Sequence, residues 1–283
     1  MSPTLLSFGH GYSAQALVQL LPSDWRVIGT TRGEAAKRAD GRSEMVRFPG
    51  ADMSAALAGA SHLLISAGPG EAGDPVLAEL RDEIAAQADR YEWVGYLSTT
   101  GVYGDHQGAW VDEETPLTPS TKRGVARVKA EAEWQAIEGL PLHIFRLAGI
   151  YGPGRGPFAK VRKGTARRII KEGQVFSRIH VEDIARVLMA SLNASRPGAV
   201  YNLCDDDPAP PEDVIAYAAE LLGVPVPEAV SFEEAEMTLM ARSFYAESKR
   251  VSNAKIKGEL GVQLKYPEYR SGLRALLALE AEA

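Results

Sequence analysis

Residues 4–17 read TLLSFGHGYSAQAL, an apolar run that leads into a glycine loop and then into a helical pattern. The run is typical of a buried strand, and Gly9–Ala14 fit the pattern G-x-G-x-x-A. Apolar residues then recur at helical spacing as far as Leu21, and Pro22 stops the pattern. A strand, a glycine turn and a helix in this order predict the first unit of an α/β protein that binds a dinucleotide.

Each position of this loop has a physical task in the prediction. Gly9 makes the tight turn, Gly11 lets the backbone approach a pyrophosphate, and Ala14 is small enough for close packing of helix on strand. Backbone amides at the start of the helix then face the negative charge. We therefore expect the cofactor-binding loop to comprise Gly9, His10, Gly11, Tyr12, Ser13 and Ala14.

Strand and helix patterns alternate through the first 150 residues. Continuously apolar runs stand apart from one another, with helical patterns such as Val76–Tyr91 and Val125–Glu138 between them. Apolar strands separated by helices predict a parallel sheet covered on both faces. The predicted strands after the first are Trp25–Thr31, Met45–Phe48, His62–Gly68, Trp93–Thr100 and Leu142–Ile150.

The pattern changes after Ile150. A Gly/Pro-rich segment, Tyr151–Phe158, and a Pro-rich segment, Asp205–Asp213, interrupt it, and the remainder is mostly helical. The chain therefore predicts an α/β fold: a Rossmann doubly wound parallel sheet with a smaller, discontinuous, mostly helical C-terminal substrate lobe. Such sheets bind ligands at the carboxyl ends of their strands, so we expect the lobe to close over that edge. The predicted division is residues 1–152 and about 178–204 for the sheet domain, and about 153–177 and 205–283 for the lobe.

Composition narrows the class of protein. The 283 residues are 45% hydrophobic and 24% charged, which is ordinary for a globular chain, and the net charge of −6 argues against nucleic acid as a partner. The single cysteine, Cys204, excludes a disulfide framework and a cysteine-based zinc site. The chain has neither the apolar run of about 18 residues that spans a membrane nor a signal-peptide pattern. We expect a cytoplasmic protein without a metal site, a membrane association or a nucleic-acid partner.

The end of the second strand distinguishes NADP from NAD. A carboxylate there would bind the ribose 2′-hydroxyl, but the strand ends with Thr30, Thr31 and Arg32, and the first carboxylate is Glu34. An arginine meets a 2′-phosphate with a charge-assisted fork of hydrogen bonds, and a threonine hydroxyl adds a donor. We expect NADP, bound through Thr31 and Arg32. The alternative is NAD, with Arg32 in solvent and Glu34 on the ribose.

Five segments together resemble the NAD(P)-dependent epimerase/dehydratase family, the extended short-chain dehydrogenases/reductases. They occur in the family's order between residues 97 and 208. The resemblance as a whole spans nearly the whole chain and is strongest to the atypical members of the family. The resemblance implies a nicotinamide that lies against strand ends near Ala67, Gly68 and Thr99. The segments are LSTTGVYGDHQG (97–108), VDEETPLTP (111–119), FRLAGIYGPGR (145–155), RIHVEDIARVL (178–188) and GAVYNLCDDDP (198–208).

The same resemblance implies an active site whose usual acid is missing. The family places Tyr-x-x-x-Lys on the helix after the fifth strand and a Ser or Thr on that strand. Thr99 matches the Ser or Thr, while Arg123 and Arg127 occupy the tyrosine and lysine positions. Arginine is not deprotonated in proteins, so Arg123 cannot perform the proton transfer of a tyrosine. Tyr103 and Tyr151 lie nearer the predicted cleft as replacement acids, and a packed aromatic role is the alternative for each.

The two arginines leave three interpretations open. In the first, Arg127 pairs with Glu131 one turn later and both arginines are solvated. In the second, both arginines face the cleft and anchor an anionic substrate. In the third, the alignment is shifted and Lys122 or Lys129 is the functional residue. A Tyr-x-x-x-Lys does occur at 245–249, but it lies far beyond the expected helix, and we interpret it as a coincidental match.

Basic residues concentrate between 155 and 171, where seven lysines and arginines occur without an acidic residue. This run predicts either a phosphate-binding mouth to the cleft or an ordinary solvated face. The family resemblance also implies substrate contacts in this region and beyond it. The expected substrate-binding residues are Tyr151, Arg155 and Arg178.

The sequence therefore predicts an NADP-binding oxidoreductase or epimerase with non-standard acid/base residues. Its expected substrate is a small anionic molecule, phosphorylated or sugar-like. The alternative is a non-catalytic NADP sensor that reports cofactor occupancy to a partner protein. The resemblance leaves the oligomeric state open between a monomer and a homodimer, since relatives often dimerise through the two helices that correspond to Val76–Tyr91 and Val125–Glu138.

Overall fold

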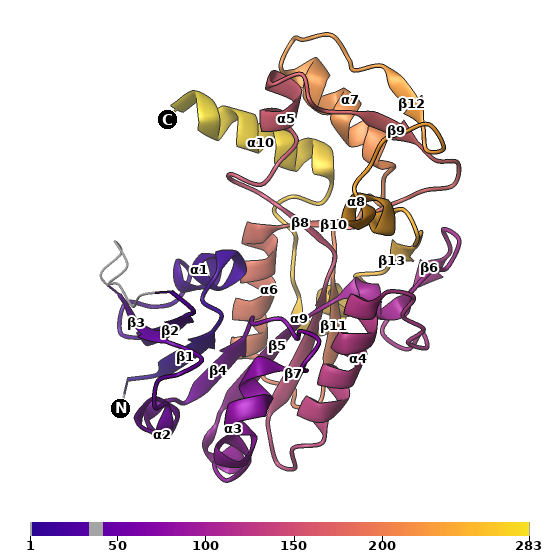
Figure 1. Cartoon of the computed structure of the whole chain (residues 1–283). Coiled ribbons are helices and arrows are strands. Elements are labelled where there is room, and N and C mark those ends of the chain that lie inside the picture. Colours follow the sequence, from indigo (N-terminus) through magenta and orange to yellow (C-terminus); the bar gives the residue numbers. More distant parts are fainter. Residues whose placement is uncertain (1, 34–41, 283) are drawn as a thin grey trace.

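A seven-stranded parallel sheet forms the larger part of the protein (Figure 1). The computed structural model describes residues 2–33 and 42–282. The strand order β3-β2-β1-β4-β5-β7-β11 reverses its direction beside β1, which makes the carboxyl ends of β1 and β4 the topological switch point. The strands are β1 (Thr4–Phe8), β2 (Arg26–Thr31), β3 (Ser43–Arg47), β4 (His62–Ile65), β5 (Trp93–Thr99), β7 (Leu142–Leu147) and β11 (Val200–Leu203).

Helices cover both faces of the sheet, as the apolar strands predict (Figure 1). Successive strand residues serve the two faces: Leu5 packs in one core and Leu6 in the other. The predicted Rossmann α/β fold is confirmed. Within the described residues, no helix is long and apolar enough to cross a membrane. One face carries α1 (Tyr12–Val18), α6 (Val181–Asn193) and α9 (Ala254–Leu260), and the other carries α2 (Ser54–Gly59), α3 (Pro75–Ala85) and α4 (Lys122–Gln135).

Two predicted elements are interrupted in the structure. The helix expected at 76–91 ends with α3, and a short 3₁₀ turn, η1 (Ala88–Arg90), follows it. The strand expected at 142–150 divides into β7 and β8 (Gly149–Tyr151). The division arises because Gly149 donates its backbone N–H to Ser177, so β8 leaves the large sheet and pairs with β10 (Arg178–His180).

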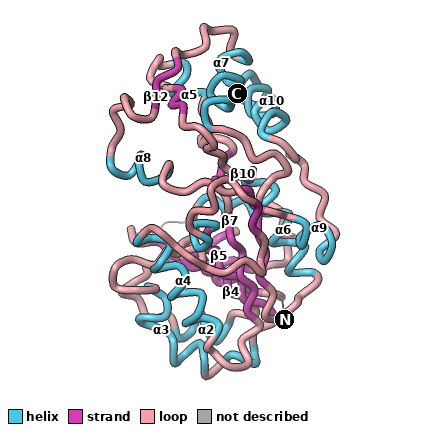
Figure 2. Tube along the Cα trace, turned by 90° about the vertical axis from the view of Figure 1, so that its right-hand side faces the viewer, coloured by secondary structure: helices cyan, strands magenta, loops and turns pink. Residues whose placement is uncertain are grey.

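A smaller lobe stands at the carboxyl ends of the strands, above the sheet in Figures 1 and 2. Its own core includes Phe158, Ala218 and Leu273. More of it is helix than strand, and its short strands β9 and β12 pair with each other. The elements of the lobe are α5 (Phe158–Arg162), β9 (Arg168–Ile170), α7 (Pro211–Leu221), β12 (Ala229–Ser231), α8 (Leu239–Phe244) and α10 (Tyr269–Glu282).

The chain returns from the lobe to the sheet domain before its last helix. Strand β13 (Arg250–Val251) pairs with β6 (Trp110–Val111), and α9 then packs against β11 and α6. Ile256 and Val262 are buried in the same core as α1. The sequence-based division assigned all of 205–283 to the lobe. The structure shows instead that this returning segment belongs to the sheet domain, because its apolar side chains pack in the core beside β11.

A buried ion pair fastens α4 to the sheet. The guanidinium of Arg146 on β7 lies 2.8 Å from the carboxylate of Glu131 on α4, and these side chains are 6% and 2% exposed. Ser98 on β5 donates a hydrogen bond to the same carboxylate. Arg146 also donates to the hydroxyl of Tyr103 at 3.0 Å, and that hydroxyl donates to Asn202 at 2.7 Å. This network fixes the position of α4 against β5 and β7.

Removal of one partner from this pair should be costly. We expect Glu131→Ala to lower the free energy of unfolding by about 3–5 kcal/mol, because it leaves a buried guanidinium without its counter-charge. The matched control is Glu133→Ala on the same helix, where the pair with Lys129 is 3.6 Å long and its side chains are 68% (Lys129) and 35% (Glu133) exposed. That change should cost less than about 0.5 kcal/mol. Urea unfolding measures both, and equal losses would contradict the assignment.

Candidate functional site

The glycine loop has the geometry that the sequence predicts for close approach of a ligand. Gly9 has φ +74°, and a Cβ there would lie 2.7 Å from the backbone nitrogen of Ala67. Its own N–H donates to the Thr30 hydroxyl at 2.9 Å. Gly11 has no such constraint, since a Cβ there would meet only the Gly9 carbonyl at an ordinary 3.6 Å. The fold therefore requires glycine at position 9 but leaves the space beside Gly11 open.

Side chains of the loop point away from that space. The His10 ring is buried over Gly29, where a Cβ would lie 2.6 Å from the ring, so His10 offers only its backbone. Ser13 and Ala14 are buried on the inner side of α1. The first backbone N–H groups of any α-helix lack an intrahelical partner. At the start of α1, no side chain of the described residues accepts a capping hydrogen bond from them.

Tyr12 joins the glycine loop to the lobe. Its hydroxyl donates to the carbonyl of Pro153 at 2.9 Å, and burial raises the pKa of this phenol. The guanidinium of Arg155 lies 5.2 Å from the centre of the Tyr12 ring. Arg155 was expected at the substrate. It does not line the cavity described below and instead covers the outer side of the loop.

The end of β2 carries the two residues expected at the ribose. The Thr31 hydroxyl accepts a hydrogen bond from the N–H of Gly33 at 3.3 Å, and Arg32 is exposed. Glu34, the alternative ribose ligand, lies outside the described residues. The choice between NADP and NAD therefore stays a prediction.

A cavity of about 810 Å³ lies between the carboxyl ends of β5 and β7 and the lobe. Thr99, the last residue of β5, lines it together with the beginning of α4. Because β1, β4 and β5 are parallel neighbours, Thr99 lies on the same sheet edge as the glycine loop, with Ala67 and Gly68 between them after β4. The cavity is thus placed beside the predicted cofactor site.

Arg127 and Arg123 have different surroundings. Arg127 points inward and donates to the Leu97 carbonyl at 2.6 Å and to the Tyr96 hydroxyl at 3.1 Å. The first interpretation, a pair between Arg127 and Glu131, is wrong, because Glu131 is held by Arg146. The sheet-end contacts of Arg127 place its guanidinium beside Gly68, where a Cβ would lie 2.9 Å from Nη2.

Arg123 reaches the cavity and is exposed. Its guanidinium lies 5.9 Å from the centre of the Phe244 ring on α8. The anion-anchor interpretation is therefore sterically open for Arg123, whereas Arg127 does not line the cavity. Of the lysines in the third interpretation, Lys129 pairs with Glu133 on the outer face of α4, and Lys122 lines the cavity.

Neither candidate tyrosine presents its hydroxyl to the cavity. Tyr103 is buried below it, with its hydroxyl bonded to Asn202 and Arg146, and burial raises its pKa. Tyr151 lines the cavity, but its hydroxyl is buried against Gly272 of α10. Burial also raises the pKa of Tyr151 strongly. The structure therefore removes Tyr103 as a replacement acid and places the Tyr151 hydroxyl away from any ligand in the cavity.

Arg178 lines the cavity, but the other basic residues expected at its mouth do not. Its Nη1 donates to the carbonyls of Phe176 and Ala209 at 2.9 and 3.0 Å, and burial lowers the pKa of Arg178. None of the seven basic residues between 155 and 171 lines the cavity within the described chain. Arg162, for example, pairs with Glu280 on the surface, which agrees with the solvated-face interpretation.

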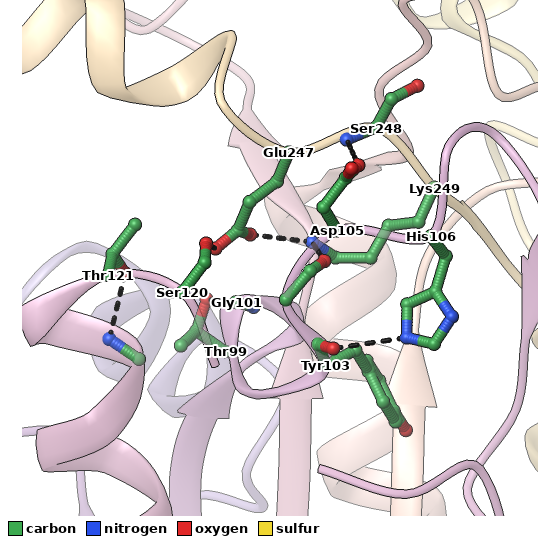
Figure 3. Close-up of polar contacts among 12 residues, drawn as sticks. Thr99, Gly101, Tyr103, Asp105, His106, Ser120, Thr121, Glu247, Ser248 and Lys249 are labelled. Atoms are coloured by element: carbon green, nitrogen blue, oxygen red, sulfur yellow. Dashed lines mark hydrogen bonds and ion pairs between the residues drawn. The ribbon is translucent and has the colours of Figure 1, made fainter. Parts of the chain in front are cut away.

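Two cavity residues were not predicted as site residues, although both lie in the segment 245–249 that was interpreted as a coincidental match. Figure 3 shows Glu247 and Lys249 beside the loop after β5, and both line the cavity. The Lys249 ammonium lies 2.7 Å from Glu247 Oε2 and donates to the Gly104 carbonyl at 2.6 Å. The Ser120 hydroxyl donates to Glu247 Oε1 at 2.6 Å. These contacts hold a C-terminal segment against the candidate site.

The Tyr-x-x-x-Lys at 245–249 is not a helical motif in the structure. Helix α8 ends at Phe244, and Lys249 directly precedes β13. The Tyr245 ring packs against Phe176 and Phe232, so the tyrosine and lysine do not act as a pair. The two residues thus do not share a helical turn, which agrees with the interpretation of a coincidental match. Pairing of β13 with β6 nevertheless carries Lys249 into the cavity, and no local sequence signal indicates that pairing.

Comparisons with known proteins place part of the chain in a known family. A family model described as the NAD dependent epimerase/dehydratase family matches residues 78–204. Residues 78–204 therefore carry a domain of this family. A functionally unknown conserved protein from Silicibacter pomeroyi DSS has a solved structure that is 64% identical, with 98% of both chains covered and a TM-score of 0.94.

More distant solved structures share the fold over the whole chain. UDP-glucuronic acid 4-epimerase from Bacillus cereus, solved in complex with NAD, is 18% identical, with 99% of both chains covered and a TM-score of 0.77. At this identity the likeness establishes the fold alone. Protein YeeZ from Escherichia coli (strain K12) is 30% identical over 187 residues, which is 65% of this chain. The matched region spans 62% of the length of YeeZ.

A buried carboxyl lies behind Arg178. Asp205 follows β11, and its backbone N–H donates to the Arg178 carbonyl at 2.6 Å. Neither carboxyl oxygen has a hydrogen-bond partner among the described residues. Burial raises the pKa of Asp205 to about 8, against the opposing influence of Arg178. At pH values between the ordinary pKa of 3.8 and about 8, Asp205 therefore binds a proton in the folded protein and has released it in the unfolded chain.

This linkage predicts a loss of stability at rising pH. The contribution of protonated Asp205 is complete below its ordinary pKa of 3.8 and disappears as the pH rises towards about 8. We expect Asp205→Asn, which stays neutral, to flatten the pH dependence and to exceed the wild type in stability at pH 8 by at least about 1 kcal/mol. Urea unfolding at pH 5 and pH 8 measures this. Parallel pH profiles of the two proteins would contradict it.

Proposed function

We propose that this epimerase/dehydratase-family protein is an NAD(P)-dependent oxidoreductase or epimerase that acts on a small anionic molecule, phosphorylated or sugar-like. The observation that carries the proposal is the shared sheet edge. The open space beside Gly11 and the cavity at Thr99 follow strands β1 and β5 of one parallel sheet. A dinucleotide along that edge has room at one end for its pyrophosphate and a substrate cavity at the other.

The residues of the loop fit a dinucleotide. The backbone N–H groups of Tyr12 and Ser13 at the uncapped start of α1 would hold the pyrophosphate, and the absent side chain of Gly11 would let it approach. Arg32 at the end of β2 would meet a 2′-phosphate, so NADP is the proposed form and NAD the alternative. When bound, the nicotinamide supplies or accepts a hydride.

Charge at the cavity supports an anionic substrate. Its lining includes four basic side chains and a single carboxylate, although the whole chain has a net charge of −6. That carboxylate, Glu247, is already paired with Lys249. Arg123 has no carboxylate within ion-pair distance in the described chain, and its guanidinium stacks near an aromatic ring. Arg123 would therefore bind a substrate anion with two parallel hydrogen bonds.

The chain's own residues would orient the reaction without a tyrosine. Thr99 would donate or accept a hydrogen bond at the reacting oxygen, as the family's serine or threonine does. Apolar walls such as Leu147, Phe176 and Phe244 would exclude water from the cavity and strengthen its polar interactions. The arginine at position 123 binds but does not exchange protons, so another group must handle the proton.

The cofactor site is tested by Gly11→Ala. We expect this variant to keep the stability of the wild type, because the added methyl has space in the protein itself. It should weaken NADP⁺ binding by about tenfold or more, because the methyl occupies the position of the pyrophosphate. Calorimetric titration with NADP⁺, NADPH and NAD⁺ measures the affinities, and urea unfolding provides the stability control. Unchanged affinity in the variant would disprove this placement.

A second candidate function is a non-catalytic NADP sensor, which the arginine in the tyrosine position favours. NADPH oxidation with a panel of carbonyl compounds, including nucleotide sugars and sugar phosphates, separates the two functions. We expect turnover with an anionic member of the panel and a loss of affinity for it in Arg123→Met. Tight NADPH binding without turnover, together with a partner protein captured only with NADPH present, would support the sensor instead.

A further inference from the structure

The cavity contains few groups that can exchange a proton. Six titratable side chains of the described residues line it: Lys122, Arg123, Tyr151, Arg178, Glu247 and Lys249. The two arginines stay charged. The tyrosine hydroxyl is buried against Gly272 and faces away from the cavity. Lys122 is an exposed first residue of α4 with no contact to fix its ammonium. This elimination leaves the pair of Glu247 and Lys249.

Geometry distinguishes the two members of the pair. Both oxygens of Glu247 are occupied, one by Ser120 and the other by Lys249. An ammonium has three donors, and Lys249 uses one on Glu247 and one on the Gly104 carbonyl. A third N–H of Lys249 is left for a ligand. The side chains are only 10% (Lys249) and 12% (Glu247) exposed, so the ammonium is held in place and partly desolvated at the cavity wall.

The segment that carries the pair is anchored to the sheet domain on both sides. The backbone N–H of Ser248 donates to Asp105 at 2.8 Å, and β13 begins one residue after Lys249. Figure 3 shows that Lys249 extends from this segment toward the loop that follows Thr99. A side chain from the far end of the sequence thus reaches the loop that follows Thr99 and lines the cavity in which the substrate oxygen is proposed to lie.

We propose that Lys249 is the proton donor of this site and that Glu247 is its positioning residue. The inference rests on the proposed function. It is written for the direction in which a carbonyl compound is reduced and a reduced nicotinamide supplies the hydride. As hydride adds to the carbonyl carbon, the π electron pair moves to the oxygen. That oxygen takes a proton from Lys249 Nζ: one N–H bond breaks, one O–H bond forms, and Lys249 becomes a neutral amine. In the reverse direction the neutral amine accepts the proton.

Glu247 and the Gly104 carbonyl give this lysine its role. They orient the ammonium before a ligand binds. Less entropy is then lost when the ammonium and the reacting oxygen are brought into the geometry for proton transfer. The missing tyrosine of α4 is thereby replaced from another part of the chain, and Arg123 remains free to bind the substrate anion.

The first test needs no substrate. Brief acetylation of the purified protein with a small activated ester, quantified by peptide mass spectrometry, reports whether the amine reaches the cavity. We expect Lys249 to react within about tenfold of the rate of Lys122, which lines the same cavity. A Lys249 that stays unmodified while Lys122 is fully acetylated would overturn the proposal, because such an amine is closed to any ligand.

The second test compares Lys249→Met with Lys249→Arg on the carbonyl compound that the wild type reduces. Both variants should lose about 100-fold or more in kcat, since arginine keeps the charge but does not give up its proton. Both should bind NADP⁺ as tightly as the wild type in calorimetric titration. Rescue by arginine to within about threefold of wild type would identify a charge anchor and overturn the role as acid. Lys129→Met, on the outer face of α4, is the matched control.

A third readout separates positioning from plain structural support. Glu247→Gln should lower kcat by about tenfold or more while KM stays within about threefold of the wild type, because the ammonium loses the partner that orients it. An unchanged kcat would remove Glu247 from the mechanism. If the wild type binds no NADP⁺ and reduces no carbonyl, the proposed function fails, and acetylation still decides whether Lys249 faces the cavity.

Discussion

The ion pair between Arg146 and Glu131 is the constraint on which the arrangement of the site depends. It buries two charges under α4 and joins them to Ser98 on β5 and to the Tyr103 hydroxyl. A buried pair of this kind is costly to break, so α4 has one position on the sheet. That position sets where its arginines lie relative to the end of β5.

This constraint explains how the site differs from the family pattern. With Glu131 committed to the sheet, Arg127 donates instead to the carbonyl and hydroxyl groups of strand β5. Arg123, one turn earlier, is left at the cavity wall. Neither arginine exchanges protons, so α4 of this chain offers no acid at the position where the family pattern has a tyrosine. The segment that crosses back from the lobe brings an ammonium and a carboxylate to the same cavity.

The sequence predicted what depends on local pattern. The strand, glycine turn and helix around Gly9 follow from periodicity and backbone sterics, and the parallel sheet follows from apolar runs between helices. Which side chains contact each other depends on how segments far apart in the sequence pair in the fold, and the sequence did not predict these contacts. Glu131 lies one helical turn from Arg127 on α4, yet its carboxylate forms its ion pair with Arg146 of strand β7. Tyr103 was expected at the cleft because it follows the end of β5, which lies there. In the structure its ring is buried in the core. Lys249 enters the cavity only because β13 pairs with β6.

A crystal structure of the protein with NADP⁺ tests the central claim, a dinucleotide laid along one sheet edge, most directly. The account predicts pyrophosphate oxygens at the backbone N–H groups of Tyr12 and Ser13, the 2′-phosphate at Arg32, and the nicotinamide between Gly68 and Thr99. Lys249 Nζ should then face the nicotinamide side of the cavity. A cofactor bound elsewhere, or a nicotinamide turned away from Thr99 with Lys249 behind a closed wall, would contradict it.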